Sequence, residues 1–222
     1  MNRALVARLI LKDWYLSRTP LVLIAAAGVL SIGLLYVRRA DIGTVALITS
    51  LIALIMLSIL LPLQTVVNER KQHNLAFVMS LPISPMQYTA AKVVGNLSAF
   101  LVLWAAIAIG VLGTLARTGI FGGIIPFGVV VALEPFVVFC LLLSVAIVVE
   151  SEMWAMLTMG ATNVSYSFWF LLLKIPGLPE QLKSPVAIWS RPILLMLAGQ
   201  LTVIVTSLVL TFYLQSRKRN FV

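Results

Sequence analysis

The sequence predicts an all-α membrane protein in which residues 1–222 form a single transmembrane domain. Three observations lead to that fold class: six long apolar runs, a low content of charge, and the gathering of that charge between the runs. Of the 222 residues, 61% are hydrophobic and only 10% are charged, and the mean hydropathy is +1.09. A soluble domain carries about 25% charged residues, so this composition excludes a soluble globular protein.

Residues 2–19 precede the first long apolar run and mix basic with apolar side chains. Leu5 and Leu9 share one helical face, while Trp14 and Tyr15 are suited to the headgroup layer of a membrane. We therefore expect an N-terminal interfacial helix that lies on the membrane. A solvated helical tail is the alternative.

Six apolar runs are long enough to cross the ~30 Å hydrocarbon layer at about 1.5 Å per residue. We place these spans at about 20–37, 43–67, 93–115, 124–149, 153–173 and 192–214. Pro62, Pro126 and Pro135 should kink their helices, because a proline removes a backbone hydrogen bond. The start of the fourth run at Gly122-Gly123 is ambiguous, and an alternative topology merges or drops that run.

The longest polar interruption covers residues 68–92, between the second and third spans. Pro82 should end a short helix at about 74–80, because proline disfavours helix in the residue before it. Ser84 is a predicted N-cap, with Pro85 at the first helical position of the next helix. This stretch therefore predicts a short rigid helix and a sharp turn outside the membrane.

The distribution of lysine and arginine predicts the orientation. With both termini and the 68–92 loop inside, ten of the 16 basic residues lie inside and six lie outside. This bias favours cytoplasmic termini in a bacterial-type cell membrane, with Arg38-Arg39 as the main counter-evidence.

The outer segment 174–191 contains three prolines among apolar residues. We expect it to be re-entrant or to cap the outer end of the bundle before span six, rather than to form an ordinary exposed loop.

No catalytic constellation is visible, so we expect no enzyme activity from this chain. The only histidine, His73, lies in the 68–92 loop, and the only cysteine, Cys140, allows no intramolecular disulfide and no cysteine-based metal site. The net charge of +9 comes from basic residues in short loops and ends, which suit lipid headgroups rather than nucleic acid. A phosphate loop of the form G-x-x-x-x-G-K-[ST] is absent, so the chain cannot bind ATP in that way.

Polar residues within the spans are candidates for a translocation pathway. Glu134 lies near the middle of span four, and ionisable groups at that depth usually face a cavity or a partner. Asn163 in span five and Gln200 in span six lie at comparable depths. A structural alternative is a protonated Glu134 that is hydrogen-bonded to a neighbouring helix. The glycines at 28, 33, 110 and 113 are assigned only to close helix packing.

This pattern resembles the ABC type-2 transporter permeases, the membrane-spanning subunits of ATP-binding-cassette exporters. At the level of architecture, the resemblance covers the whole chain. At the level of sequence, it is concentrated at Glu69-Arg70, at the turn 81–84 and at Lys92. In that family the short cytoplasmic helix between spans two and three is a coupling helix. The family commonly has an acidic residue in that helix, whereas His73-Asn74 occupy the region here.

The resemblance implies an ATP-driven exporter for an amphipathic cargo such as a lipid, a peptide or an antibiotic-like molecule. The chain would act as a homo- or heterodimer with separate ATPase subunits. It would bind no cofactor itself, because ATP and Mg would be held by the partner ATPase. The residues implied in ATPase coupling are Glu69, Arg70, Lys71, Phe77, Met79, Leu81, Pro82, Ser84 and Pro85. The alternative is the substrate-capture subunit of a vitamin-type importer, which would need a richer polar pocket.

Overall fold

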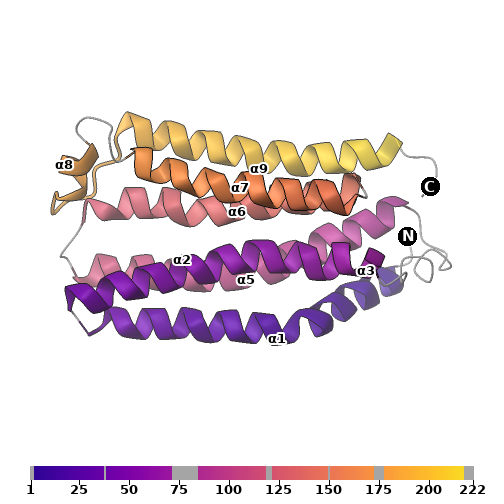
Figure 1. The fold of residues 1–222 in the computed structure, drawn as a ribbon, viewed down its shortest axis with the longest axis horizontal. Helices are drawn as coiled ribbons and strands as arrows, with labels where there is room; N and C mark the ends of the chain where they lie inside the picture. The colour runs from indigo at the N-terminus through magenta and orange to yellow at the C-terminus, as the bar shows by residue number, and fades with distance from the viewer. Residues whose placement is uncertain are drawn as a thin grey trace.

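The computed structural model describes residues 3–37, 39–71, 85–118, 122–149, 151–172 and 178–217, and every regular element in these ranges is helical (Figure 1). The predicted all-α class is therefore confirmed. The elements are α1 (Arg3–Leu35), α2 (Ala40–Pro62), the π-helix η1 (Leu63–Val67), α3 (Asn68–Lys71), α5 (Pro85–Thr118), α6 (Ile124–Val148), α7 (Glu152–Leu172), α8 (Leu178–Leu182) and α9 (Arg191–Arg217).

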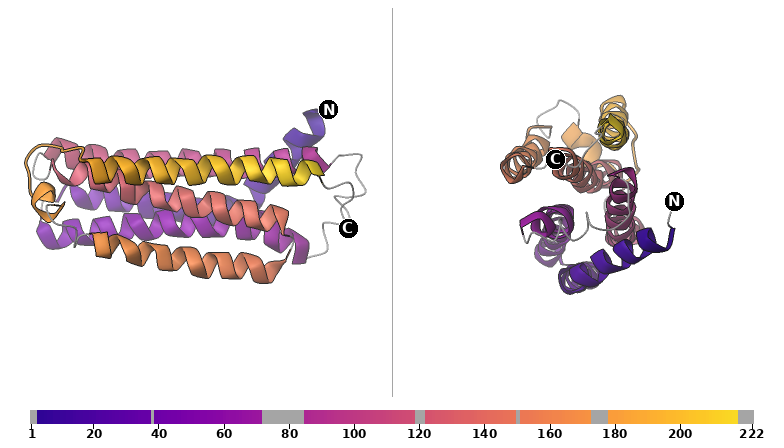
Figure 2. Two further views of the ribbon diagram at one scale, coloured as in Figure 1. Left: turned by 90° about the horizontal axis from the view of Figure 1, so that it is seen from above. Right: turned by 90° about the vertical axis from the view of Figure 1, so that its right-hand side faces the viewer.

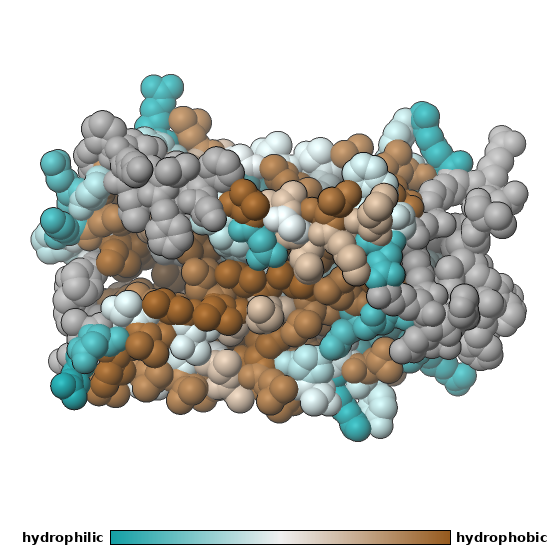
Figure 3. Space-filling view, in the orientation of Figure 1, coloured by the Kyte–Doolittle hydropathy of each residue, from teal (hydrophilic) through white to brown (hydrophobic). Residues whose placement is uncertain are grey.

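Five helices in the described part of the chain are long and apolar enough to cross a membrane. These candidate spans are Ala7–Leu35, Asp41–Val67, Met86–Arg117, Ile124–Val148 and Arg191–Arg217. Apolar side chains dominate the middle of the surface, and hydrophilic side chains gather toward its two ends (Figure 3). The chain is therefore a multi-pass membrane protein. The fifth of the six spans predicted from the sequence, 153–173, corresponds to α7, which is not among these five helices.

The long helices form two halves that lie side by side (Figures 1 and 2). In the N-terminal half, α1 packs against both α2 and α5. In the C-terminal half, α6 packs against both α7 and α9, and contacts of α6 with α2 and α5 join the halves. The start of α1, the end of α3, the start of α5 and the end of α9 lie at one end of the bundle, and α8 lies at the other. We call these the α3 end and the α8 end.

Helix α1 is continuous from Arg3 to Leu35 and contains Pro20 in its interior. No break separates the interfacial helix predicted at 2–19 from the span predicted at 20–37, and the interfacial position of the first part stays a prediction. Proline removes one backbone hydrogen bond, which can bend a helix without ending it. The first part of α1 swings away from the bundle (Figure 2).

The other prolines have different local consequences. Pro62 is followed by the π-helix η1, a wider turn that occurs frequently at functional sites. Pro126 lies in the first turn of α6, where its missing N–H would have had no helical partner. Pro135 lies inside α6, which continues to Val148. Helix α6 is also the most deeply buried candidate span, so the alternative that merged or dropped the fourth run is wrong.

Glycines bring α1 and α5 into close contact. A Cβ at Gly28 would lie 2.5 Å from Cγ1 of Ile107, and a Cβ at Gly110 would meet the Ile32 side chain. The predicted packing role is thus confirmed for Gly28 and Gly110. A Cβ at Gly33 would have nothing within 4 Å, and the same holds at position 113, so these two glycines make no close approach.

The described part of the predicted outer segment packs on the start of α6 at the α8 end. The Gly123 N–H donates to the Ser184 carbonyl at 2.8 Å. A Cβ at Gly123 would lie 2.0 Å from the Gln181 carbonyl oxygen, so only glycine fits there. Leu178 is buried against Val130 of α6. Residues 178–184 are therefore held against the bundle rather than exposed as an ordinary loop.

Candidate functional site

A buried lysine connects three segments at the α3 end. Lys92 on α5 has 0% exposure, and its Nζ lies 2.9 Å from Oδ2 of Asp13 on α1. The same Nζ contacts the carboxylate of Glu69 on α3 and donates to the Thr65 carbonyl of η1 at 2.8 Å. Lysine is almost never fully buried unless it is paired. One ammonium group therefore joins α1, the η1–α3 segment and α5.

Lys12 completes this group of charges. Its Nζ lies 2.6 Å from Oε1 of Glu69, and its side chain is 42% exposed, whereas the Glu69 side chain is 3% exposed. We call Lys12, Asp13, Glu69 and Lys92 the ion cluster. Its two ammonium groups balance its two carboxylates. This balance is needed for stability, because an unpaired charge in the interior costs on the order of several kcal/mol.

The electrostatics of Glu69 follow from these contacts. Burial by itself would raise the pKa of this carboxyl group. The charge of Lys92 and the hydrogen bonds from Lys12 and Lys92 outweigh burial, so the pKa of Glu69 lies below its ordinary value of 4.5. Glu69 is therefore ionised throughout the physiological pH range and keeps its pairing with both lysines.

Neutral hydrogen bonds surround the ion cluster. Oγ1 of Thr65 lies 2.7 Å from Oδ1 of Asn96, and the Asn96 amide donates to the Lys92 carbonyl at 2.8 Å. The Trp14 indole N–H donates to the Gly95 carbonyl at 3.2 Å. A satisfied buried polar network is rigid, because moving one member leaves others without partners. The ion cluster therefore fixes α1, η1 and α5 as one unit.

The ion cluster lies at the base of the predicted coupling stretch, and Glu69 belongs to both. Arg70 and Lys71 continue α3, and Pro85 begins α5 as predicted. The remaining predicted coupling residues lie outside the described residues: Phe77, Met79, Leu81, Pro82 and Ser84. The structure adds Lys12 and Asp13, which the sequence analysis did not assign to a site. Their adjacent opposite charges within one helix were the available signal.

A second polar group lies near the middle of the C-terminal half. Oε1 of Glu134 on α6 lies 2.8 Å from Oγ of Ser165 on α7. Nε2 of Gln200 on α9 donates to Oε2 of Glu134 at 2.9 Å and to the Val130 carbonyl at 3.1 Å. Glu134 and Gln200 are each only 7% exposed. We call Glu134, Ser165 and Gln200 the carboxyl cluster.

The structure thus brings together two of the three residues predicted for a translocation pathway. Asn163 is exposed, and its Nδ2 donates to the Met159 carbonyl of its own helix at 2.8 Å. Residues two positions apart point to different faces of a helix, so Ser165 faces Glu134 while Asn163 does not. Ser165 was missed because a serine in an apolar run carries no distinctive signal of its own.

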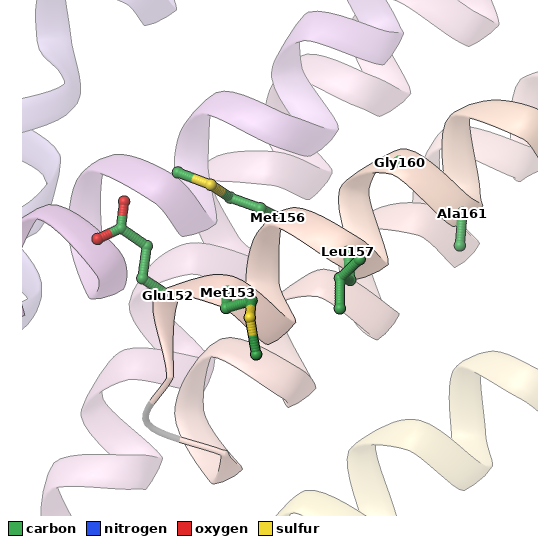
Figure 4. Close-up of a pocket in the computed structure, with 6 residues that line it drawn as sticks. All are labelled: Glu152, Met153, Met156, Leu157, Gly160 and Ala161. Atoms are coloured by element: carbon green, nitrogen blue, oxygen red, sulfur yellow. The ribbon is translucent and has the colours of Figure 1, made fainter.

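An open groove of about 750 Å³ runs along the first half of α7 (Figure 4). It is lined by Glu152, Met153, Met156, Leu157, Gly160 and Ala161, all from one helix. Apart from Glu152 in the first turn of α7, this lining is apolar. The groove contains no residue of either cluster and is suited to contact with lipid chains. Among the described residues, no group of three or more His, Cys, Asp or Glu side chains is placed to hold a metal ion.

Comparison of the chain with protein-family models, curated proteins and solved structures finds no match. Function is therefore argued from the helix arrangement and the two clusters. The ion cluster has the geometry of a rigid joint between helices. The carboxyl cluster has the geometry of a buried hydrogen-bonded contact that joins α6, α7 and α9.

Proposed function

We propose that this chain is the membrane-spanning permease subunit of an ATP-driven exporter, with a separate ATPase chain that docks on the stretch between α3 and α5. The observation that carries the proposal is the ion cluster. It joins the helix before this stretch, through Glu69, to the helix after it, through Lys92. A coupling element has to transmit movement of the ATPase to the membrane helices without deforming where it joins them. A polar network whose buried charges are paired resists such deformation.

The contacts of the ion cluster suggest how movement of the docked ATPase would reach the membrane helices. Movement of α3 would reach Lys92 on α5 through Glu69, and would reach α1 through Asp13. The close glycine contacts between α1 and α5 would carry the same movement along the membrane. The N-terminal half would then move as one body against the C-terminal half, which is a rigid-body mode of transition.

The remaining parts of the proposal extend the predictions from the sequence. Helix α7 is proposed as a further span, the fifth in chain order, so that six helices cross the membrane. Both termini are proposed to be cytoplasmic, and two permease subunits to form the pathway. The cargo is proposed to be amphipathic: a lipid, a peptide or an antibiotic-like molecule. Asn163 is exposed on the surface of its own subunit, which suits a pathway shared with a second subunit. Segment 174–191 is proposed to cover the outer opening of the pathway between the two subunits.

Copurification and transport by matched variants test the proposal. We expect the tagged chain to copurify with an ATPase that contains a phosphate loop. Phe77→Ala/Met79→Ala should lose this ATPase, because truncation removes apolar contacts at the docking surface. Pro82→Gly/Pro85→Gly should keep the ATPase but transport poorly, because glycine frees backbone angles that proline fixes. The readouts are the bound ATPase, ATP turnover and transport in reconstituted vesicles.

Val186→Ala/Ile188→Ala is the matched control, because it truncates two exposed apolar side chains at the α8 end. This variant should retain the ATPase and its activity. Normal association and normal transport in both variants of the 68–92 stretch would contradict the coupling role. Binding of a small vitamin-like ligand by the isolated chain would instead favour the capture subunit of an importer.

Labelling from outside the cell tests the orientation independently. In a Cys140→Ala background, a cysteine at the exposed position Ser216 should resist an impermeant thiol reagent in intact cells, and one at the exposed position Lys183 should react. Permeabilised cells provide the control, since both positions should then react. Reaction at position 216 in intact cells would place the α3 end outside and remove the ATPase from the proposal.

A further inference from the structure

Two exposed arginines are stacked on tyrosine rings of their own helices. The guanidinium carbon of Arg18 on α1 lies 4.2 Å from the centroid of the Tyr15 ring. The guanidinium carbon of Arg217 on α9 lies 4.6 Å from the centroid of the Tyr213 ring. The two tyrosines are 64% and 48% exposed, so each guanidinium group is held on the outer surface of the bundle. We call Tyr15 with Arg18 the α1 pair and Tyr213 with Arg217 the α9 pair.

Helix direction and helix length locate both pairs relative to the membrane. Helix α1 starts at the α3 end and α9 ends there (Figure 1). Side chains tilt toward the N-terminus of their helix, so Arg18 reaches toward the α3 end and Arg217 reaches back from it. Counted from the α8 end at ~1.5 Å per residue, α1 reaches Arg18 after about 27 Å and α9 reaches Arg217 after about 40 Å. The hydrocarbon layer is ~30 Å thick and the bilayer with its headgroups is ~40–45 Å thick, which puts both guanidinium groups in the headgroup layer.

The charge of these two arginines is not balanced within the described part of the chain. The ion cluster pairs its own two ammonium groups with its own two carboxylates, and no carboxylate of the described residues pairs with Arg18 or Arg217. A guanidinium group that rests on an aromatic face still presents N–H groups at its edge, and these can donate to two phosphate oxygens at once. Each pair therefore suits a phosphate group that brings no cation of its own.

We propose that the α1 pair and the α9 pair each bind the phosphate of an anionic glycerophospholipid in the leaflet at the α3 end. A lipid fits better than a free anion, because exposed apolar side chains flank each pair on the same helix face and can contact acyl chains. These flanking residues are Leu11, Val22, Leu210 and Leu214. One pair lies on each half of the bundle, so both halves bind the same headgroup layer. The proposal does not depend on the exporter function or on which side of the membrane the α3 end faces.

Native mass spectrometry of the full-length protein tests the proposal. The protein is released from micelles that contain phosphatidylglycerol and phosphatidylcholine in equal amounts. Wild type should retain phosphatidylglycerol in preference, because choline already supplies a cation to its phosphate. Arg18→Gln and Arg217→Gln should each lose one of two preferentially bound phosphatidylglycerol molecules, and the double variant should lose both. An unchanged preference in the double variant would overturn the proposal.

Arg8→Gln is the matched control, because Arg8 is exposed on α1 but contacts no aromatic ring among the described residues. This variant should retain both lipid molecules. A loss equal to that of Arg18→Gln would show that net charge alone selects the lipid, which contradicts the proposal. Tyr15→Leu/Tyr213→Leu keeps both arginines and should weaken retention, because the guanidinium groups lose the rings that hold them. Unchanged retention in that variant would overturn the assignment to the two pairs.

Two further ligands distinguish a phospholipid from other occupants. Diacylglycerol has acyl chains without a phosphate and should not be retained. Inorganic phosphate in excess has no acyl chains and should not displace bound phosphatidylglycerol. Retention of diacylglycerol would indicate apolar contact alone, and displacement by inorganic phosphate would indicate a site for free anions. Either result would overturn the proposal.

Discussion

The two buried polar clusters solve the same physical problem in opposite ways. The ion cluster keeps Lys92 fully buried by giving it two carboxylates and a backbone carbonyl. The carboxyl cluster has no cation among its members, and Glu134 accepts there from the Ser165 hydroxyl and the Gln200 amide. Paired charges lie at the α3 end, where water is close. The carboxyl cluster lies near the middle of the C-terminal half, and its donors are neutral. The comparison teaches that a buried carboxyl group can be held either by paired cations or by neutral hydrogen-bond donors.

The largest expected effect comes from removing the central cation. Lys92→Ala should destabilise the protein by about 3–5 kcal/mol, because Asp13 and Glu69 remain buried without their shared partner. Gln200→Leu in the carboxyl cluster should cost about 1–3 kcal/mol, since it removes one neutral donor and leaves the Ser165 donor in place. Denaturant unfolding in mixed micelles measures both. Equal losses in the two variants would remove the distinction between a cluster held by cations and one held by neutral donors.

The next effect concerns the α8 end of the C-terminal half. Gly123→Ala places a Cβ 2.0 Å from the Gln181 carbonyl oxygen, and a backbone atom cannot move aside as a flexible side chain does. We expect a loss of about 1–3 kcal/mol and faster proteolysis within residues 178–186. Gly113→Ala is the control, because its Cβ meets nothing within 4 Å. Equal proteolysis of the two variants would show that this segment is not held by the contact with α6.

Acid should weaken the ion cluster. Because the pKa of Glu69 is lowered in the folded protein, its contribution to stability is complete above its ordinary value of 4.5. That contribution is lost as the pH falls from there through the lower folded value. Glu69→Gln should flatten this acid limb of an unfolding profile, whereas Glu180→Gln, at an exposed position on α8, should leave it unchanged. An acid limb that survives Glu69→Gln would contradict the assignment.

The smallest effect is expected at the exposed edge of the ion cluster. Lys12→Ala should cost about 0–1 kcal/mol, because its side chain is 42% exposed and water can replace it as a partner of Glu69. Lys92→Ala is the matched comparison, since both lysines contact the same carboxylate. A loss at Lys12 as large as that at Lys92 would show that the four charges act only as a unit.

The sequence by itself determined the helical membrane class and the approximate positions of the long helices. Apolar run length is a local property, and the need to satisfy backbone groups in lipid leaves helices as the solution for such runs. It also predicted that Pro85 begins a helix and that Gly28 and Gly110 allow close packing. It did not predict that α1 runs unbroken through Pro20, because a proline inside a helix costs one hydrogen bond that surrounding contacts can offset.

Only the tertiary structure decided which polar residues act together. Lys12, Asp13, Glu69 and Lys92 come from three separate stretches of sequence, and their pairing depends on how α1, α3 and α5 cross. The same holds for Ser165, which approaches Glu134 while Asn163, two positions earlier, faces outward. Hydropathy and spacing report what one segment does in a membrane. The partner of a buried charge is set by packing between segments, which no single segment encodes.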